Sequence, residues 1–359
     1  MGVFYGELAL VYFFSLVSRI CNYKKQRIMA ILFGILTVIV LVVVAGLSRG
    51  IGDSGMYKHS YNILVQNPSS ATFDRDGGWT LYNLILTFIS SNPQTLLIIT
   101  ALITHLLNFI ILYKYQSYLE LQVYLYIASG YYLVTMNGMR QCLAAALIFI
   151  CTKYLIQGKF KKYLVSILLI SSIHGSALIM IPIYFIVRQE AWSKRIMKLL
   201  ILAVIGVISY GYLEPIFFKL LENTQYGHYS EFKEGGSSLM RTIVNLVPTI
   251  LAYLKRDKLK EVWAEGNIFI NMSIINSIFV AFGMYNWIFN RFTLYFQLYN
   301  FILLPYIIKS CFKGKEKRLL YIGLLICYFI FLYREQVIGL NIQYRSDYLD
   351  FNKLFYTTN

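Results

Sequence analysis

The chain has 359 residues, of which 58% are hydrophobic, and it carries a formal net charge of +16 with a mean hydropathy of +0.58. A soluble domain of this length does not need so much apolar surface. Uncharged apolar stretches recur at the roughly 17–25 residues that cross a bilayer. The composition therefore excludes a soluble enzyme and predicts an all-α polytopic membrane protein, with residues 1–359 as a single transmembrane domain.

Ten apolar segments are predicted to be membrane spans. The N-terminal segment lacks the basic region and A-x-A site of a cleaved signal, so we expect it to be the first span. Residues 163–187 have basic clusters on both sides, which predicts two short legs that bend at "SIHGS" (172–176). Together these give about 10–12 transmembrane helices, short half-helices included, with both termini outside. The ten spans are residues 3–18, 28–47, 94–113, 119–136, 137–157, 198–220, 239–254, 267–286, 287–308 and 318–334.

Three large segments are expected on the outer side. Residues 48–93 form the largest loop, with helices on the membrane surface predicted at 56–67 and 79–90. Residues 221–241 form a second loop, whose polar, glycine-containing sequence suits a lid. Residues 335–359 form an outer C-terminal tail.

Basic residues divide unevenly between the two predicted sides. The cytoplasmic loops hold 22 Lys and Arg against 6 acids, and the outer segments hold 11 against 11. The positive-inside rule describes this asymmetry, so the net charge needs no nucleic-acid partner. Arginine accounts for 7 of the 11 outer basic residues but only 6 of the 22 inner ones. Because guanidinium groups bind carboxylates and phosphates through two parallel hydrogen bonds, the outer face is predicted to recognise anions.

Arg140, in "MNGMRQCLAAALIF", is predicted to lie at the outer end of a span, ahead of small residues that let helices pack closely. The small residues are Ala144, Ala145 and Ala146. An arginine at this depth needs a partner or a wet cavity. Arg140 is therefore a candidate phosphate ligand; the alternative is that it extends to the lipid headgroups.

Arg291, in "NRFTLYFQLYNFILLP", is the second candidate cation. Arg291, Tyr295 and Tyr299 recur at i, i+4 and i+8, which predicts that they share one helical face. A guanidinium above tyrosines suits a phosphate joined to a sugar. The alternative is an aromatic belt at the membrane surface.

His174 is the first candidate base, because a histidine at the bend can transfer a proton near neutral pH. The alternative is a histidine bonded to a carbonyl that the bend frees. Asp53 clusters with Arg49, Tyr57 and His59 where the first large loop leaves the membrane. Arg241, at the end of the second loop, adds another cation.

The sequence gives little support for a metal site or for nucleotide binding. The D-x-D sequence at residues 74–76 is more simply explained as a surface turn, and the five cysteines show no disulfide or zinc spacing. His105 is predicted to be a core histidine. No P-loop, nucleophile elbow or H-E-x-x-H is present in the sequence, so we expect no cofactor and no metal site.

Four blocks of the sequence resemble the EpsG family of membrane proteins, which are Wzy-type polysaccharide polymerases. The blocks are "SRGIGDSGMYKHSY", "MNGMRQCLAAALIF", "FKKYLVSILLISSIHGSALIMIPIY" and "NRFTLYFQLYNFILLP", and the resemblance covers roughly residues 30–310. The arginine block and the H-x-S-A block are the most specific. The motif positions that carry over are Arg49, Asp53, Arg140, His174 and Arg291.

The resemblance implies a glycosyltransferase-type polymerase on the outer face of the bacterial cytoplasmic membrane. Undecaprenyl-diphosphate-linked oligosaccharide repeat units would be joined into an O-antigen, capsule or exopolysaccharide. Arg140 and Arg291 would stabilise the leaving diphosphate, and His174 or Asp53 would accept the proton of the attacking hydroxyl. Expected partners are the lipid-linked oligosaccharide and membrane lipids, with a chain-length regulator and a flippase as further candidates. The residues expected to bind substrate are Arg49, Tyr57, Arg241, Tyr295 and Tyr299.

Two other classes remain open. A flippase for lipid-linked oligosaccharide would also need arginines for the diphosphate, but it predicts cations through the bundle interior, whereas here most lie at the ends of spans. A glycosyltransferase that uses a lipid-phosphate sugar shares the outward cavity. The sequence barely separates it from the polymerase.

Overall fold

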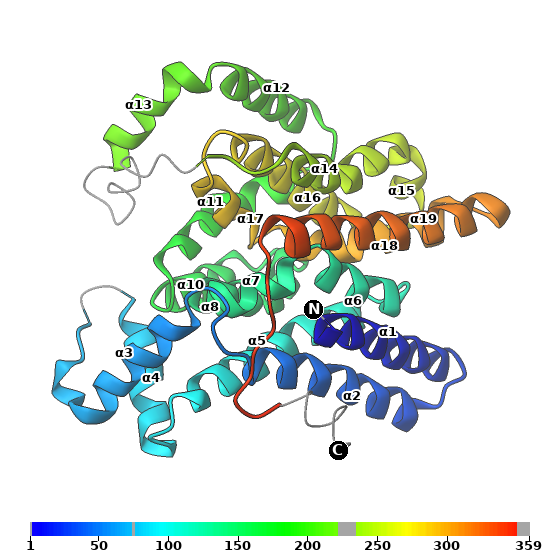
Figure 1. Cartoon of the computed structure of the whole chain (residues 1–359). Coiled ribbons are helices and arrows are strands. Elements are labelled where there is room, and N and C mark those ends of the chain that lie inside the picture. Colours follow the sequence, from blue (N-terminus) through cyan, green and yellow to red (C-terminus); the bar gives the residue numbers. More distant parts are fainter. Residues whose placement is uncertain (1, 74–75, 222–234, 350–359) are drawn as a thin grey trace.

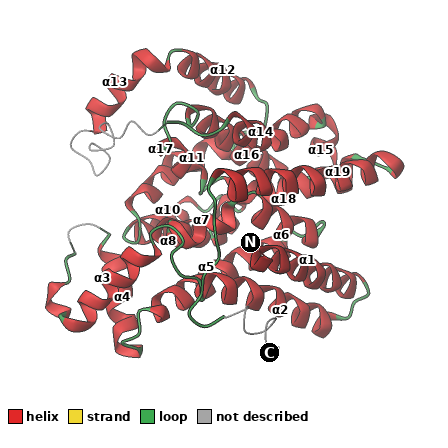
Figure 2. Ribbon diagram, in the orientation of Figure 1, coloured by secondary structure: helices red, strands yellow, loops and turns green. Residues whose placement is uncertain are grey.

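Helices account for every regular element in residues 2–73, 76–221 and 235–349, the parts of the chain that the computed structural model describes (Figures 1 and 2). Within these ranges four helices are long and apolar enough to cross a membrane, and a bent pair makes a possible fifth. The chain is therefore a multi-pass helical membrane protein, as predicted. The four are α1 (Gly2–Tyr23), α2 (Arg27–Gly46), α5 (Gln94–Lys114) and α19 (Gly314–Leu332), which continues as a π-helical turn, Tyr333–Gly339.

The other helices are shorter. They are α3 (Ser54–Gln66), α4 (Gly77–Ile89), α6 (Leu119–Ala128), α7 (Tyr131–Asn137), α8 (Met139–Ile150), α9 (Thr152–Ile156), α10 (Phe160–Ser171), α11 (Met180–Val187), α12 (Lys194–Ile208), α13 (Tyr210–Leu221), α14 (Leu239–Leu254), α15 (Arg256–Val262), α16 (Gly266–Phe282), α17 (Ile288–Thr293) and α18 (Gln297–Cys311). Several of the predicted spans thus correspond to apolar helices of 10–17 residues.

Helices α6, α8, α16 and α18 form the interior and are buried on nearly every face, as expected for helices that are apolar all round. The three alanines after Arg140 are at most 1% exposed, so this part of α8 is a packed helix as predicted. His105 is 1% exposed, and its Nδ1 lies 2.8 Å from the Tyr126 hydroxyl. The prediction of a core histidine is confirmed.

Residues 163–187 form two legs, which confirms the predicted bend. Helix α10 ends at Ser171, and the chain passes through His174 into a 3₁₀ turn (Gly175–Ile179) and then α11. The two surface helices predicted in the first loop are also present, as α3 and α4.

Three predicted continuous spans are wrong. The span 119–136 breaks at Gly130, whose φ of +82° is left-handed and where a Cβ would lie 2.5 Å from Gln336 Nε2. The span 198–220 bends by 89° between α12 and α13. The span 287–308 is interrupted by turns at 294–296, between α17 and α18. Hydropathy measures only total apolarity, so it does not register breaks that neighbouring segments stabilise.

Two ends of the molecule differ in the side chains that they hold. We call the end that holds Gly50, Asp76, Arg140, His174 and Arg241 the cavity end. The opposite end holds the Arg19–Glu120 ion pair and Lys309, with the α1–α2 turn and the start of α19 at the right of Figure 1.

Candidate functional site

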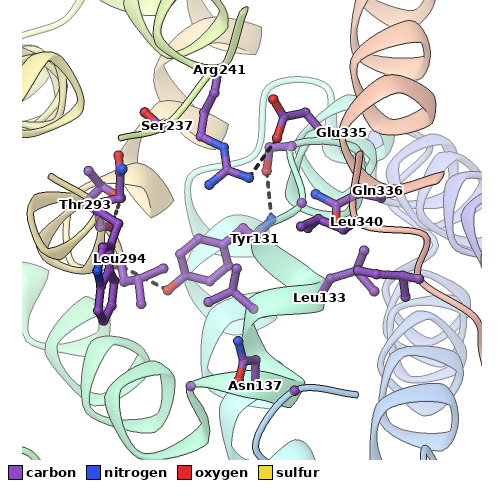
Figure 3. Close-up of a pocket in the computed structure, with 18 of the residues that line it drawn as sticks. Tyr131, Leu133, Asn137, Ser237, Arg241, Thr293, Leu294, Glu335, Gln336 and Leu340 are labelled. Carbon is purple, nitrogen blue, oxygen red and sulfur yellow. Dashed lines mark hydrogen bonds and ion pairs between the residues drawn. The ribbon is translucent and has the colours of Figure 1, made fainter. Parts of the chain in front are cut away.

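A cavity of about 860 Å³ lies between α7, α14, α17 and the segment after α19. Its size falls within the range of about 300–1,000 Å³ that small-molecule sites occupy. In Figure 3, Tyr131 crosses the cavity, with Thr293 and Leu294 on one wall and Gln336 and Leu340 on the other. Much of the wall is polar, which suits a ligand rich in hydroxyl groups. The amide side chains that line it belong to Asn137, Asn245, Asn290, Gln297, Gln336, Asn341 and Gln343.

Three arginines and one acid line the cavity. Arg241 Nη2 lies 2.8 Å from Glu335 Oε2, and the Ser238 hydroxyl also donates to Glu335 (Figure 3). Arg291 and Arg345 have no carboxylate within ion-pair distance among the described residues. The cavity lining therefore carries an excess of two positive charges, which suits an anionic ligand.

The break between α17 and α18 determines which side chains lie beside Arg291. Arg291 lies in α17, with its guanidinium 4.9 Å from the centre of the Trp287 ring, and both residues line the cavity. Tyr295 and Tyr299 are at most 1% exposed; their hydroxyls bond to Ser176 at 2.6 Å and Thr152 at 2.8 Å. The predicted shared face is wrong, because the helix does not continue from 291 to 299. Neither tyrosine lines the cavity.

The C-terminal segment forms one wall that the sequence left without a role. Residues 340–343 and Arg345 line the cavity. The Arg345 carbonyl accepts the Arg49 N–H at 2.8 Å, and the Tyr344 hydroxyl donates to the Val44 carbonyl at 3.1 Å. These contacts hold the segment against the end of α2. Residues 350–359 of the predicted tail lie outside the described residues.

A second group of polar side chains lies at the same end, around Asp76. Asp76 Oδ2 is 3.0 Å from Arg140 Nη1 and 3.8 Å from His174 Nδ1, and Oδ1 accepts the Gly175 N–H at 2.9 Å. The contact with His174 is electrostatic, since 3.8 Å is too long for a hydrogen bond. Burial would raise the pKa of Asp76, but His174, Arg140 and the Gly175 N–H together hold this pKa below its usual value. Asp76 therefore stays ionised at neutral pH.

In the sequence, Asp76 stands out only as the last residue of a D-x-D, whose other two residues, 74 and 75, lie outside the described residues. No group of three or more His, Cys, Asp or Glu residues suited to a metal occurs in the part of the chain that the structure describes. The sequence could have indicated the contact between Asp76 and Arg140 only by the presence of an acid and an arginine on the outer side. Because the sequence has several outer acids, it does not single out Asp76.

Arg140 reaches both the carboxylate and solvent. Its side chain is 35% exposed, so the ion pair with Asp76 leaves part of the guanidinium free for a ligand. Tyr57 is buried, with its ring edge-on to Trp79 at 5.7 Å between ring centres. Burial raises the pKa of Tyr57, and the nearby Arg140 guanidinium opposes that rise. Tyr57 thus lies beside Arg140 rather than in the cavity.

Hydrogen bonds link this group to the cavity. Gln141, next to Arg140, donates to the Arg291 carbonyl at 2.8 Å. Asn137, which lines the cavity, accepts the Asp53 N–H at 3.0 Å. Arg140 and Arg291 are therefore on adjoining elements, as the sequence analysis assumed for a joint site. Arg49 lies apart, 64% exposed and paired with Asp347 at 2.5 Å.

A helical bundle with several apolar spans and a positively charged cavity at one end defines a multi-pass membrane protein that can accommodate an anionic, hydroxyl-rich molecule. The sequence model of the EpsG family matches residues 8–346, so the chain belongs to this family. Membership indicates a membrane protein of the polysaccharide-polymerase type. Comparisons with curated proteins and with solved structures find no match.

Proposed function

We propose that this protein joins undecaprenyl-diphosphate-linked oligosaccharide repeat units into a surface polysaccharide, with the cavity end on the outer face of the bacterial cytoplasmic membrane. The observation that carries this proposal is the cavity itself. It has two arginines without a carboxylate partner among the described residues, and its wall is rich in amides. A diphosphate supplies the negative charge, and a saccharide supplies hydroxyl groups for the amides.

The chemistry divides between the two groups of side chains. A hydroxyl of one repeat unit attacks the anomeric carbon of the growing chain and gives its proton to His174 Nε2. The new glycosidic bond forms as the bond from carbon to phosphate oxygen breaks, and the electron pair leaves on the diphosphate. Arg140 and Arg291 stabilise the charge on this leaving group. Asp53 is the other candidate base.

The remaining cations bind substrate. Arg345 extends the positive wall beyond Arg291, and Arg241, fixed by Glu335, borders the same space. Arg49 and Tyr57 act at the margin, where the headgroup enters. This division places the charge of the diphosphate near the membrane surface and the saccharide in the cavity.

The orientation is supported by the distribution of charge. The loops predicted to be cytoplasmic contain most of the lysines, as the positive-inside rule describes. The cavity end contains Arg140, Arg241, Arg291 and Arg345 together with acids. Repeat units that have already crossed the membrane would therefore meet the cavity directly.

The test is polymer synthesis by the purified protein with lipid-diphosphate-linked repeat units and no nucleotide. Long polymer is the expected product. A product lengthened by one sugar only would instead indicate the lipid-phosphate-sugar glycosyltransferase. Absence of any product, with the protein folded and the lipid bound, would contradict the proposal.

A flippase is the second candidate, and Glu7 is the observation that favours it. The Glu7 side chain is buried in α1, and both carboxyl oxygens lack a hydrogen-bond partner among the described residues. Ionisable groups inside a membrane often serve proton relays in transporters. Translocation of lipid-linked oligosaccharide without polymer, abolished in Glu7→Gln, would support this alternative.

A further inference from the structure

Asp76 connects three parts of the chain that are distant in sequence. It precedes α4, and it contacts Arg140 at the start of α8 and both His174 and Gly175 at the bend after α10. Its side chain is 9% exposed, and both carboxylate oxygens are engaged. A buried carboxylate with this many partners is costly to disturb.

The backbone around Asp76 fixes the position of its side chain. Asp76 has a φ of +48°, in the left-handed region that non-glycine residues seldom adopt. The Gly78 N–H donates to the Ser172 carbonyl at 2.9 Å. A Cβ at Gly78 would lie 2.2 Å from Ser172 Oγ, so only glycine permits this approach. The start of α4 is therefore fixed directly against the bend that carries His174.

We propose that Asp76 is a positioning residue that holds Arg140 and His174 in a fixed relation, with the proton on His174 Nδ1 and Nε2 left to accept the proton of the attacking hydroxyl. This inference rests on the proposed polymerase function. A carboxylate that faces one ring nitrogen favours the proton on that nitrogen and stabilises the imidazolium that forms during the reaction. Catalytic contacts are often longer without substrate than with it, so a separation of 3.8 Å is compatible with this role.

The charged groups that face His174 are on two elements. Asp76 comes from the segment before α4, and Arg140 comes from α8. Asp76 Oδ2 lies within 4 Å of both Arg140 Nη1 and His174 Nδ1. Tyr57, on α3, lies beside Arg140.

The experiment compares Asp76→Asn, Asp76→Glu and a control, Asp347→Asn, in the full-length protein. Asp76→Asn keeps the size of the side chain and an oxygen for the Gly175 N–H but removes the charge. Asp76→Glu keeps the charge but displaces it by one methylene. The control also removes an acid paired with an arginine, Arg49, but at an exposed position.

Two readouts are measured for each variant. The first is the initial rate of polymer formation per folded protein at pH 7. The second is the pH dependence of diethyl pyrocarbonate modification at His174, located by peptide mass spectrometry, which reports the fraction of neutral imidazole and needs no polymer. The chain has only four histidines, so the modified peptide is easily assigned.

Asp76→Asn is expected to lower the rate at least tenfold and to move the modification midpoint to lower pH, because it removes the carboxylate charge that faces His174. Asp76→Glu is expected to keep the midpoint and lose rate, and Asp347→Asn to change neither. A slower Asp76→Asn enzyme with an unchanged midpoint would reduce Asp76 to a structural role and overturn the inference. A wild type that makes no polymer would contradict the proposed function, whereas the midpoint shift would still establish the contact between Asp76 and His174.

Discussion

The two ends of the molecule use ion pairs differently. At the opposite end, Arg19 Nε lies 2.6 Å from Glu120 Oε2, and the Lys309 ammonium donates to the Ser117 carbonyl at 3.3 Å. These contacts join helices that are far apart in sequence, and none of their residues lines the cavity of about 860 Å³. At the cavity end, arginines outnumber the acids that pair with them. The excess charge there is more than helix packing requires, which indicates ligand binding.

The largest effect is expected at His174, if it is the base. His174→Ala should lower the polymer rate by about 10²–10⁴-fold, the usual contribution of general-base assistance, with donor binding nearly unchanged. His59, exposed on α3, provides a matched control, and His59→Ala should keep normal rates. Near-normal polymer from His174→Gln would assign His174 a structural role, and Asp53 would become the leading candidate base.

The next largest effect is expected from Arg140→Lys, which keeps the charge but loses the paired N–H donors. A hydrogen bond to a charged group contributes roughly 1.5–3 kcal/mol, so polymer yield at matched protein levels should fall about ten- to a hundredfold. Arg256→Lys is the control, because Arg256 also lies within ion-pair distance of an acid, Asp257, but is exposed and does not line the cavity. Equal yields from both variants would favour the view that Arg140 only extends to the headgroups.

A substitution at the opposite end should lower the stability of the protein and leave the polymer rate unchanged. Glu120 is 1% exposed, and besides Arg19 it accepts the Tyr321 hydroxyl at 3.0 Å. Glu120→Gln should therefore destabilise the protein by on the order of 1–3 kcal/mol, visible as a lower thermal midpoint in detergent. The polymer rate per folded molecule should stay the same. A lower rate without a lower midpoint would give the opposite end a catalytic role and remove the contrast between the two ends.

The smallest effect is the pH dependence of the Asp76 ion pair. Because the pKa of Asp76 is lowered in the folded protein, its stabilising effect is complete above the usual aspartate pKa of about 3.9 and is lost as pH falls through the lowered value. The difference in thermal midpoint between wild type and Asp76→Asn should persist from pH 8 to 5 and shrink below about pH 4. A difference that disappears already near pH 6 would show that Asp76 does not stay ionised.

Much of the fold followed from local patterns in the sequence. Apolar length predicted the helices, and basic flanks predicted the bend before His174, because both signals reside in neighbouring residues. The break between α17 and α18 was missed, since the composition remains apolar across it. Consequently Tyr295 and Tyr299, predicted to face the substrate, are core residues bonded to other helices.

The site was predicted in part. Arg140, His174 and Arg291 lie on adjoining elements, but their connections depend on Asp76 and Gln141, which bridge segments that the sequence does not relate. Arg345 was noted without a role, because its place in the cavity wall depends on the C-terminal segment folding back onto α2. Such long-range contacts follow from the packing of the whole bundle and not from any local pattern.

The most direct measurement is polymer synthesis in proteoliposomes of known orientation, with repeat units confined to one leaflet. A cysteine introduced at the exposed Ser69, in a variant whose five native cysteines are replaced, is labelled from outside the vesicle and identifies molecules whose cavity end faces the outer solution. Polymer should form when the repeat units are on the side of the cavity end and should be lost in Arg291→Ala. Polymer formed from repeat units confined to the leaflet of the opposite end would contradict the account.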